Sequence, residues 1–291
     1  MTVQPEISAI VPIHNWSSVS DNISELLKQK EIVFFKVIFI LDSCDPEAEI
    51  ELKRLLISTN NVSYIVLIRN FSSAAKSRNE GLEIVKTEWL CFWDSDDLPN
   101  LRGFLDMYSH VSNSDIDLAV GQIRTIYIRE GEEVKRKLTK TQSLFVLAMD
   151  LGFTRILYRS LFIKNLFFLN YKSGEDVIFL AKLISRKPKI FFSNVLVYRY
   201  LNVNWISKKS SNSIINELHL LHAKLYEDQR MQQDGYVKGF YLILIFKLLL
   251  SILKRIVTRD LPLTIITIFK LFRILTVRNF HHFYKLLVKR I

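Results

Sequence analysis

The stretch Trp89–Asp97 (WLCFWDSDD) joins a short apolar segment to three closely spaced carboxylates. The apolar part, Trp89–Trp93, is typical of a strand that is buried on both faces of a parallel sheet. Asp94, Asp96 and Asp97 follow at its carboxyl end, where open α/β sheets place their ligands. Three acids this close repel one another, which favours a hard divalent cation between them. The alternative is an acidic turn that only caps the next helix.

Strand-like and helix-like segments alternate along the first third of the chain, with short loops between them. Alternation at this spacing predicts an α/β fold with a mostly parallel sheet and helices on both faces. The expected strands are Ile7–Ile13, Phe34–Leu41, Val62–Ile68 and Trp89–Trp93, and the expected helices are Val19–Gln29, Pro46–Leu56 and Ser72–Val85.

After Asp97 the alternation becomes less regular. The expected helices are Leu101–Val111, one near Arg159–Asn165 and one that begins at Glu175, and the expected strands are Asp117–Gly121, Ile123–Ile128, Val134–Leu138, Thr154–Tyr158, Ile190–Phe192 and Val195–Tyr200. The polar stretch Leu201–Ser213 is expected to be a mobile loop. Trp205 lies in it, and the loop either closes over a ligand or stays exposed.

The positive charge of the chain is concentrated near its carboxyl terminus. The net charge is +11, and residues 235–291 hold eleven lysines and arginines but one acid, Asp260. The basic residues alternate with apolar runs in Phe240–Leu253 and Leu261–Leu275, a pattern that predicts amphipathic helices lying on an anionic membrane surface. The uncharged runs of this region, such as Gly239–Phe246, are too short to span a bilayer, which takes about 20 residues. The alternative is a helical subdomain that packs on the rest of the chain.

The two cysteines, Cys44 and Cys91, form no C-x-x-C pair and are expected to be free thiols. The first strand is expected within ten residues of the amino terminus, with no basic stretch and apolar core before it. We therefore expect a protein of the reducing cytoplasm, peripheral on the inner face of the cell membrane.

Five short motifs occur in a fixed order along the first two thirds of the chain. The motifs are Ala9–Asn15 (AIVPIHN), Asp42–Asp45 (DSCD), Ser77–Leu82 (SRNEGL), Phe92–Asp97 (FWDSDD) and Gly174–Asp176 (GED). Together they resemble family 2 glycosyltransferases, enzymes with the GT-A fold. The resemblance implies a GT-A catalytic domain over residues 1–210, followed by the basic helical region 211–291.

The resemblance also implies a UDP-sugar donor and a Mn²⁺ or Mg²⁺ ion. Asp96 would be the direct metal ligand, and Asp94 would contact the ribose or a metal-bound water. Arg78, at the start of a helix, would face the diphosphate, or would instead be a surface arginine paired with Glu80 or Asp97. The residues expected to bind the nucleotide sugar are Pro12, His14, Asn15, Asp42, Arg78, Asp94, Ser95 and Asp96.

Two features depart from the family pattern. His14 occupies a position where the family often has an aromatic residue. The alternative is that His14 is a partly exposed histidine in a loop, without a role in binding. The acidic turn that begins at Asp42 is one residue shorter than usual, which bears on the expected contact between Asp42 and the uracil.

Glu175 and Asp176 open a predicted helix. On the resemblance they are the catalytic pair, with Asp176 as the general base for the acceptor hydroxyl, whereas on local grounds they cap the helix. A single displacement at the sugar C1 would invert its configuration. The implied acceptor is a hydroxyl of a glycan or a lipid-linked glycan in the biosynthesis of a bacterial surface polysaccharide.

Two other functions are compatible with parts of the sequence. A sugar nucleotidyltransferase would need an early glycine-rich loop for a triphosphate, and residues 10–20 contain no glycine. A non-enzymatic membrane-binding or nucleic-acid-binding protein would use the basic tail. Its basic residues alternate with leucine, isoleucine and phenylalanine rather than with exposed aromatics, so no nucleic acid is expected.

Overall fold

The computed structural model describes residues 6–59, 62–129, 132–140, 142–149, 152–170 and 175–203. The chain divides into two compact units, and the first comprises Met1–Ser143, Gly152–Phe179 and Pro188–Ile206. Of the second unit the structure describes α5 (Leu144–Met149) and the residues from Leu180 to Lys187. The predicted membrane-associating region 211–291 and most of the predicted loop Leu201–Ser213 lie outside the described residues.

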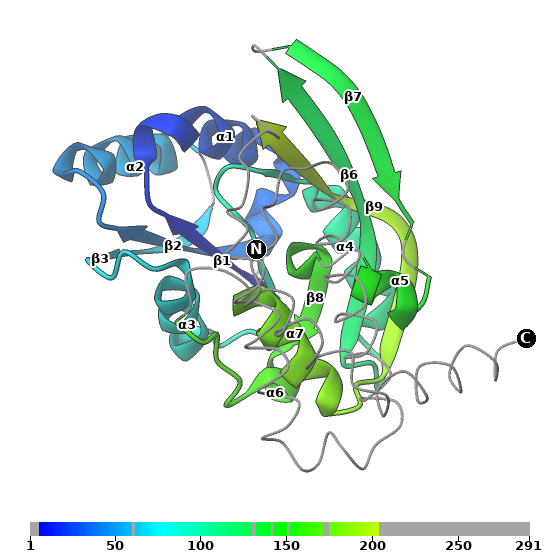
Figure 1. Ribbon diagram of the computed structural model, residues 1–291. Coiled ribbons are helices and arrows are strands. Elements are labelled where there is room, and N and C mark those ends of the chain that lie inside the picture. Colours follow the sequence, from blue (N-terminus) through cyan, green and yellow to red (C-terminus); the bar gives the residue numbers. More distant parts are fainter. Residues whose placement is uncertain are drawn as a thin grey trace, which may run out of the picture. The chain divides into compact units, whose positions relative to one another are not determined.

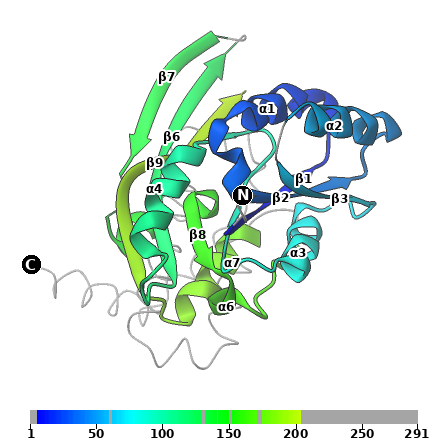
Figure 2. The same cartoon turned by 180° about the vertical axis from the view of Figure 1, so that it is seen from behind.

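The amino-terminal half of the sheet is parallel, as predicted. Its strands run in the order β3 (Ser63–Arg69), β2 (Phe35–Asp42), β1 (Ile7–Ile13) and β4 (Trp89–Phe92). One face is covered by α1 (Trp16–Lys28) and α2 (Pro46–Ser58), and the other by α3 (Ala74–Ile84), as Figure 1 and the reverse view in Figure 2 show. The boundaries differ from the expected ones by three residues or fewer.

The carboxyl-terminal half makes the sheet mixed. β8 (Ile156–Arg159) is antiparallel to both β4 and β6 (Leu118–Arg129), and β9 (Ile190–Val203) is parallel to β6. The far half of β6 pairs with β7 (Glu132–Thr139), so that the two strands form a long hairpin, prominent in Figure 1. The remaining elements are η1 (Lys30–Phe34), β5 (Leu98–Pro99), α4 (Leu101–Val111), η2 (Phe153–Arg155), α6 (Ser160–Ile163) and α7 (Glu175–Ser185).

Two of the sequence-based boundaries are wrong for the same physical reason. Asp117–Gly121 and Ile123–Ile128 were expected to be separate strands, as were Ile190–Phe192 and Val195–Tyr200, but each pair forms one continuous strand. Irregularities in the pairing of β6 with β9 at Gln122 absorb the breaks in the apolar pattern. β9 also continues to Val203, because pairing with β6 satisfies the backbone of residues whose polarity alone predicts a loop.

Close packing of α3 on β1 brings the site motifs to one edge of the sheet. A Cβ atom on Gly81 would lie 2.5 Å from Cγ2 of Ile10, so only glycine allows this approach without a shift. The carboxyl ends of the parallel strands β1, β2 and β4 therefore meet the first turns of α3. None of the helices among the described residues is long and apolar enough to cross a membrane.

Candidate active site

The three carboxylates after β4 have different surroundings. Asp94 accepts a 2.7 Å hydrogen bond from Nη2 of Arg78. Asp97 is 3% exposed, and its Oδ1 accepts a 2.8 Å hydrogen bond from the backbone N–H of Leu201 on β9. Asp96 is exposed, and within the described part of the chain no side chain donates to its carboxylate. Asp96 is therefore the acid of this turn that remains open to a cation.

Electrostatics in the turn agree with that assignment. Withdrawal from water and the charge of Asp94 raise the pKa of Asp96, although Arg78 partly offsets the effect. Burial, followed by the charges of Asp94 and Asp96, raises the pKa of Asp97 to about 9. Negative charge is thus poorly compensated at the open end of the turn, and a divalent cation with oxygen ligands fits there.

The described residues contain no group of three or more acids, histidines and cysteines that could hold a metal by themselves. Among the described residues, Asp96 and Asp94 would supply two protein ligands. That number suits Mg²⁺ or Mn²⁺ in enzymes that bind phosphates, because such ions keep waters and take substrate oxygens as further ligands.

Arg78 is buried and joins the acidic turn to the start of α7. Its guanidinium donates to Asp94 and, at 3.3 Å, to Oε1 of Glu175. It lies over the ring of Phe153 at 4.7 Å and that of Phe168 at 5.4 Å. The expected alternative, a surface arginine paired with Glu80 or Asp97, is wrong: Arg69 is the partner of Glu80.

The charge on Arg78 is secured by the acids around it. Burial alone lowers its pKa, but Asp94, Glu175 and Asp176 raise it above the ordinary value. Burial and the charge of Asp176 raise the pKa of Glu175, and Arg78 partly counters this. One guanidinium therefore lies within electrostatic reach of both predicted groups of functional acids.

Asn79, the next residue on α3, fixes the segment that carries Phe168. Its Nδ2 donates to the carbonyl of Phe168 at 2.9 Å, and the backbone N–H of Phe168 donates back to its Oδ1 at 2.8 Å. These two bonds hold the Phe168 ring against Arg78 and explain why Arg78 and Asn79 occur side by side in the third motif.

Asp42, predicted to contact the uracil, is buried at the end of β2 and shapes the loop between β3 and α3. Its carboxylate accepts hydrogen bonds from three successive backbone N–H groups and from two hydroxyls. The donors are Phe71 N (2.5 Å), Ser72 N (2.9 Å), Ser73 N (2.9 Å), Ser77 Oγ (2.9 Å) and Ser43 Oγ (3.1 Å). Burial raises the pKa of Asp42, but these donors outweigh it and lower the pKa below its ordinary value.

The other predicted nucleotide-binding residues line the same edge of the sheet. His14 is half-exposed, with Nδ1 3.4 Å from Oδ2 of Asp42. Asn15 is exposed just before α1, and its Oδ1 accepts from Ser17 Oγ at 2.9 Å. Pro12 is buried in β1, where it pairs with Ile40 of β2. Ser95 is half-buried in the acidic turn.

We expect Asp42→Asn to lower the free energy of unfolding by about 2–4 kcal/mol, because an amide nitrogen would face N–H or O–H donors. The pKa of Asp42 is lower in the folded state, so its contribution is present at neutral pH and is lost as pH falls through the folded-state pKa. Urea unfolding at neutral pH and at roughly pH 3 measures both effects.

The control is Asp45→Asn, since Asp45 is exposed before α2 and makes no side-chain capping bond. We expect less than about 0.5 kcal/mol for it. A stability difference between Asp42→Asn and the wild type that does not shrink on acidification would contradict the assignment.

Several residues that build the site carry no sequence signal of their own. Tyr198, buried on β9, accepts a 3.0 Å hydrogen bond from the backbone N–H of Asp94. Phe153 and Phe168 enclose Arg78 from segments far along the chain. Ser77 was visible within its motif, but its bond to Asp42 depends on how α3 packs.

Residues 8–186, more than half of the chain, match the sequence profile of the family described as Glycosyl transferase family 2. The chain belongs to this family. The match confirms the resemblance read from the five motifs, and it favours glycosyl transfer over the nucleotidyltransferase and the non-enzymatic alternatives.

Three known proteins illustrate the likeness. The poly(ribitol-phosphate) beta-glucosyltransferase of Bacillus spizizenii is 26% identical over 209 residues, which are 67% of this chain but 32% of that protein. S. aureus TarS 1-349 in complex with UDP-GlcNAc has a TM-score of 0.60 at 19% identity, over 82% of this chain and 72% of that one. The mannosyltransferase PcManGT of Pyrobaculum calidifontis, in complex with GDP-Man and Mn²⁺, has a TM-score of 0.55 at 11% identity, over 88% and 76%. The two structures confirm the GT-A fold.

Proposed function

We propose that this glycosyltransferase moves a sugar, with inversion, from a UDP-sugar to a hydroxyl of a glycan or lipid-linked acceptor in the biosynthesis of a bacterial surface polysaccharide. The observation that carries the proposal is the bridge made by Arg78. Its guanidinium contacts Asp94 at the end of β4 and Glu175 at the start of α7. Groups suited to holding a donor and groups suited to activating an acceptor thus lie around one side chain.

The donor nucleotide is assigned to the edge formed by β1, β2 and α3. His14 and Asn15 are exposed there, and Asp42 holds the loop that leads into α3. We place Pro12 and Asp42 behind the nucleobase as supports, with Asp42 acting through the backbone it fixes. UDP is preferred over GDP because TarS, which binds UDP-GlcNAc, has a higher TM-score than PcManGT, which binds GDP-Man.

Asp96 and Asp94 would hold Mn²⁺ or Mg²⁺, with Ser95 between them. The bound ion would supply positive charge against the charge that develops on the departing nucleotide. Asp94 is restrained by Arg78 and by the bond between its backbone N–H and Tyr198, so contacts within the protein already orient the turn.

Asp176 is assigned as the general base. It would take the proton of the acceptor hydroxyl while the hydroxyl oxygen attacks the sugar C1 on the face opposite the nucleotide. The bond between C1 and the diphosphate oxygen breaks as the new one forms, which gives inversion without a covalent enzyme intermediate. Glu175 would orient the start of α7 through Arg78.

The proposal for the acceptor rests on similarity to a known protein, and the proposal for the location rests on the basic carboxyl-terminal region. The Bacillus spizizenii relative is named for a poly(ribitol-phosphate) acceptor, a surface polymer, and this chain spans 32% of its length. The basic region 211–291 would place the enzyme on the anionic inner surface of the cell membrane, where a lipid-linked acceptor lies.

The test is release of nucleotide from a set of UDP-sugars, with GDP-Man as a comparison, in the presence of Mn²⁺, Mg²⁺ or EDTA. We expect one UDP-sugar to be turned over at least about 100-fold faster with Mn²⁺ or Mg²⁺ than with EDTA. Turnover of GDP-Man alone would contradict the donor assignment, and equal turnover in EDTA would contradict the metal assignment.

A further inference from the structure

The hairpin of β6 and β7, together with β9, presents one face toward the acidic turn. Strand pairing places Lys137, Thr125 and Tyr200 directly opposite one another across the three strands. Lys135 is opposite Tyr127 in a second row, with its Nζ 6.0 Å from the centre of the Tyr127 ring. Directly paired residues point to the same face of a sheet, so these five side chains share one surface, the hairpin face.

This face is continuous with the active site. Tyr198, two residues before Tyr200 and therefore on the same face of β9, bonds to the backbone N–H of Asp94. Tyr200 is 43% exposed, and burial together with the negative charge of the acidic turn raises the pKa of its hydroxyl. The hairpin face therefore begins at the acidic turn and leads away from it along β6 and β7.

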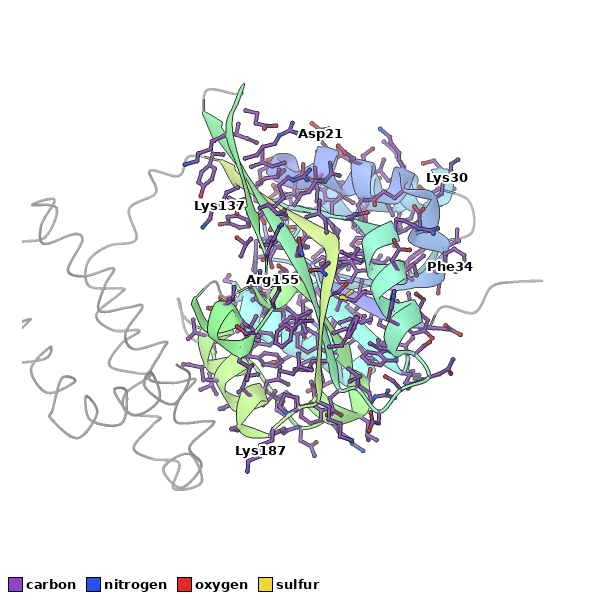
Figure 3. The ribbon with its side chains drawn as sticks, turned by 90° about the vertical axis from the view of Figure 1, so that its right-hand side faces the viewer. Asp21, Lys30, Phe34, Lys137, Arg155 and Lys187 are labelled. Atoms are coloured by element: carbon purple, nitrogen blue, oxygen red, sulfur yellow. The ribbon has the colours of Figure 1, made fainter. Side chains whose placement is uncertain are left out.

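The basic side chains on the two faces of the hairpin differ in their ion pairing. On the opposite face Arg136 pairs with Glu133, and Arg199 reaches Glu25 of α1 at 3.6 Å. On the hairpin face Lys135 and Lys137 are exposed, and no carboxylate of the described residues pairs with either lysine. Figure 3 shows Lys137 on the side of the ribbon away from Asp21 of α1.

We propose that the hairpin face binds the acceptor, and that the acceptor is a glycan chain bearing phosphodiester groups. Tyrosine rings offer an apolar surface to the C–H groups of a sugar and a hydroxyl for hydrogen bonding. Two ammonium groups to which the described residues offer no carboxylate partner complement phosphate oxygens. The two lysines lie side by side on β7 and the tyrosines lie on the neighbouring strands β6 and β9, so the face offers cationic and aromatic groups together to a polymer that carries both phosphates and polyol or sugar units. The proposal rests on the proposed function, because it takes the adjacent site to be the sugar-transfer site.

The test compares two double variants of the full-length protein. Lys135→Ala/Lys137→Ala removes two charges from the hairpin face, and Arg124→Ala/Arg136→Ala removes two from the other face of the same two-stranded hairpin. Calorimetry measures binding of poly(ribitol phosphate), of neutral dextran, and of vesicles containing phosphatidylglycerol. We expect the lysine variant to bind poly(ribitol phosphate) about tenfold more weakly than the wild type. The arginine variant should bind this polymer as tightly as the wild type, and neither variant should change the affinity for dextran.

Equal losses in both variants, or no loss in the lysine variant, would overturn the proposal. If the lysine variant lost binding to vesicles but kept its binding to the polymer, the hairpin face would be a membrane-binding surface, and this result would also overturn the proposal. Binding needs no turnover, so failure here is separate from failure of the nucleotide-release test, which examines the donor site in the wild-type protein.

Discussion

Replacing Asp176 by asparagine is expected to lower the rate of sugar transfer by about 1,000-fold, within the range that general-base catalysis contributes. The amide keeps the size of the side chain but cannot accept the proton of the acceptor hydroxyl. Asp176 lies in the first turn of α7, beside Glu175, and its charge acts on Arg78. The measurement is the steady-state rate of transfer, with the KM for the donor expected to change less than about threefold.

Glu175→Gln is the matched control for Asp176→Asn. It removes one carboxylate from the same helical turn but affects a side chain that Arg78 already engages. We expect a loss of about tenfold in transfer, because Arg78 retains Asp94 as a partner. Binding of UDP, measured by calorimetry, reports whether either variant is folded. Full transfer activity in a folded Asp176→Asn variant would remove the base assignment, and a larger loss in Glu175→Gln would move that assignment to Glu175.

The parallel part of the fold was predictable because local pattern decides it. β1, β2 and β4 are runs of apolar residues that the sheet buries on both faces, and their ends are marked by polar or turn-forming residues. The edge where ligands bind follows from strand direction alone. For that reason the sequence alone predicts that Asp94 and Asp96 lie at this edge.

The contacts within the site were not predictable, because they join segments that are distant in sequence. Nothing in the residues around Arg78 indicates that Glu175 is a partner, and nothing around Asp94 indicates Tyr198. The distinct surroundings of the three acids depend on the position of β9, a strand whose length the polarity pattern underestimated. The local sequence pattern thus identifies the carboxylates of the site, and tertiary packing decides which of these carboxylates remains accessible to a cation.

Those surroundings lead to the second large effect that we expect. Asp96→Asn should weaken binding of Mn²⁺ in the presence of UDP by about 100-fold and lower transfer by at least as much, since a neutral amide replaces the one carboxylate of the turn that is open to a cation. Electron paramagnetic resonance of free Mn²⁺ measures the metal affinity without any turnover, so a loss of binding is separable from a loss of catalysis.

Asp97→Asn is the control that makes this prediction specific, because it is the same change one residue further along the turn. Asp97 is buried against β9, and its raised pKa of about 9 means that the carboxyl already carries a proton near neutral pH. A neutral amide there replaces a neutral acid, so we expect Mn²⁺ affinity to change less than about threefold. If the two variants lost Mn²⁺ equally, the cation would be held by the total charge of the turn rather than by Asp96, and the order of roles among these three acids would have to be abandoned.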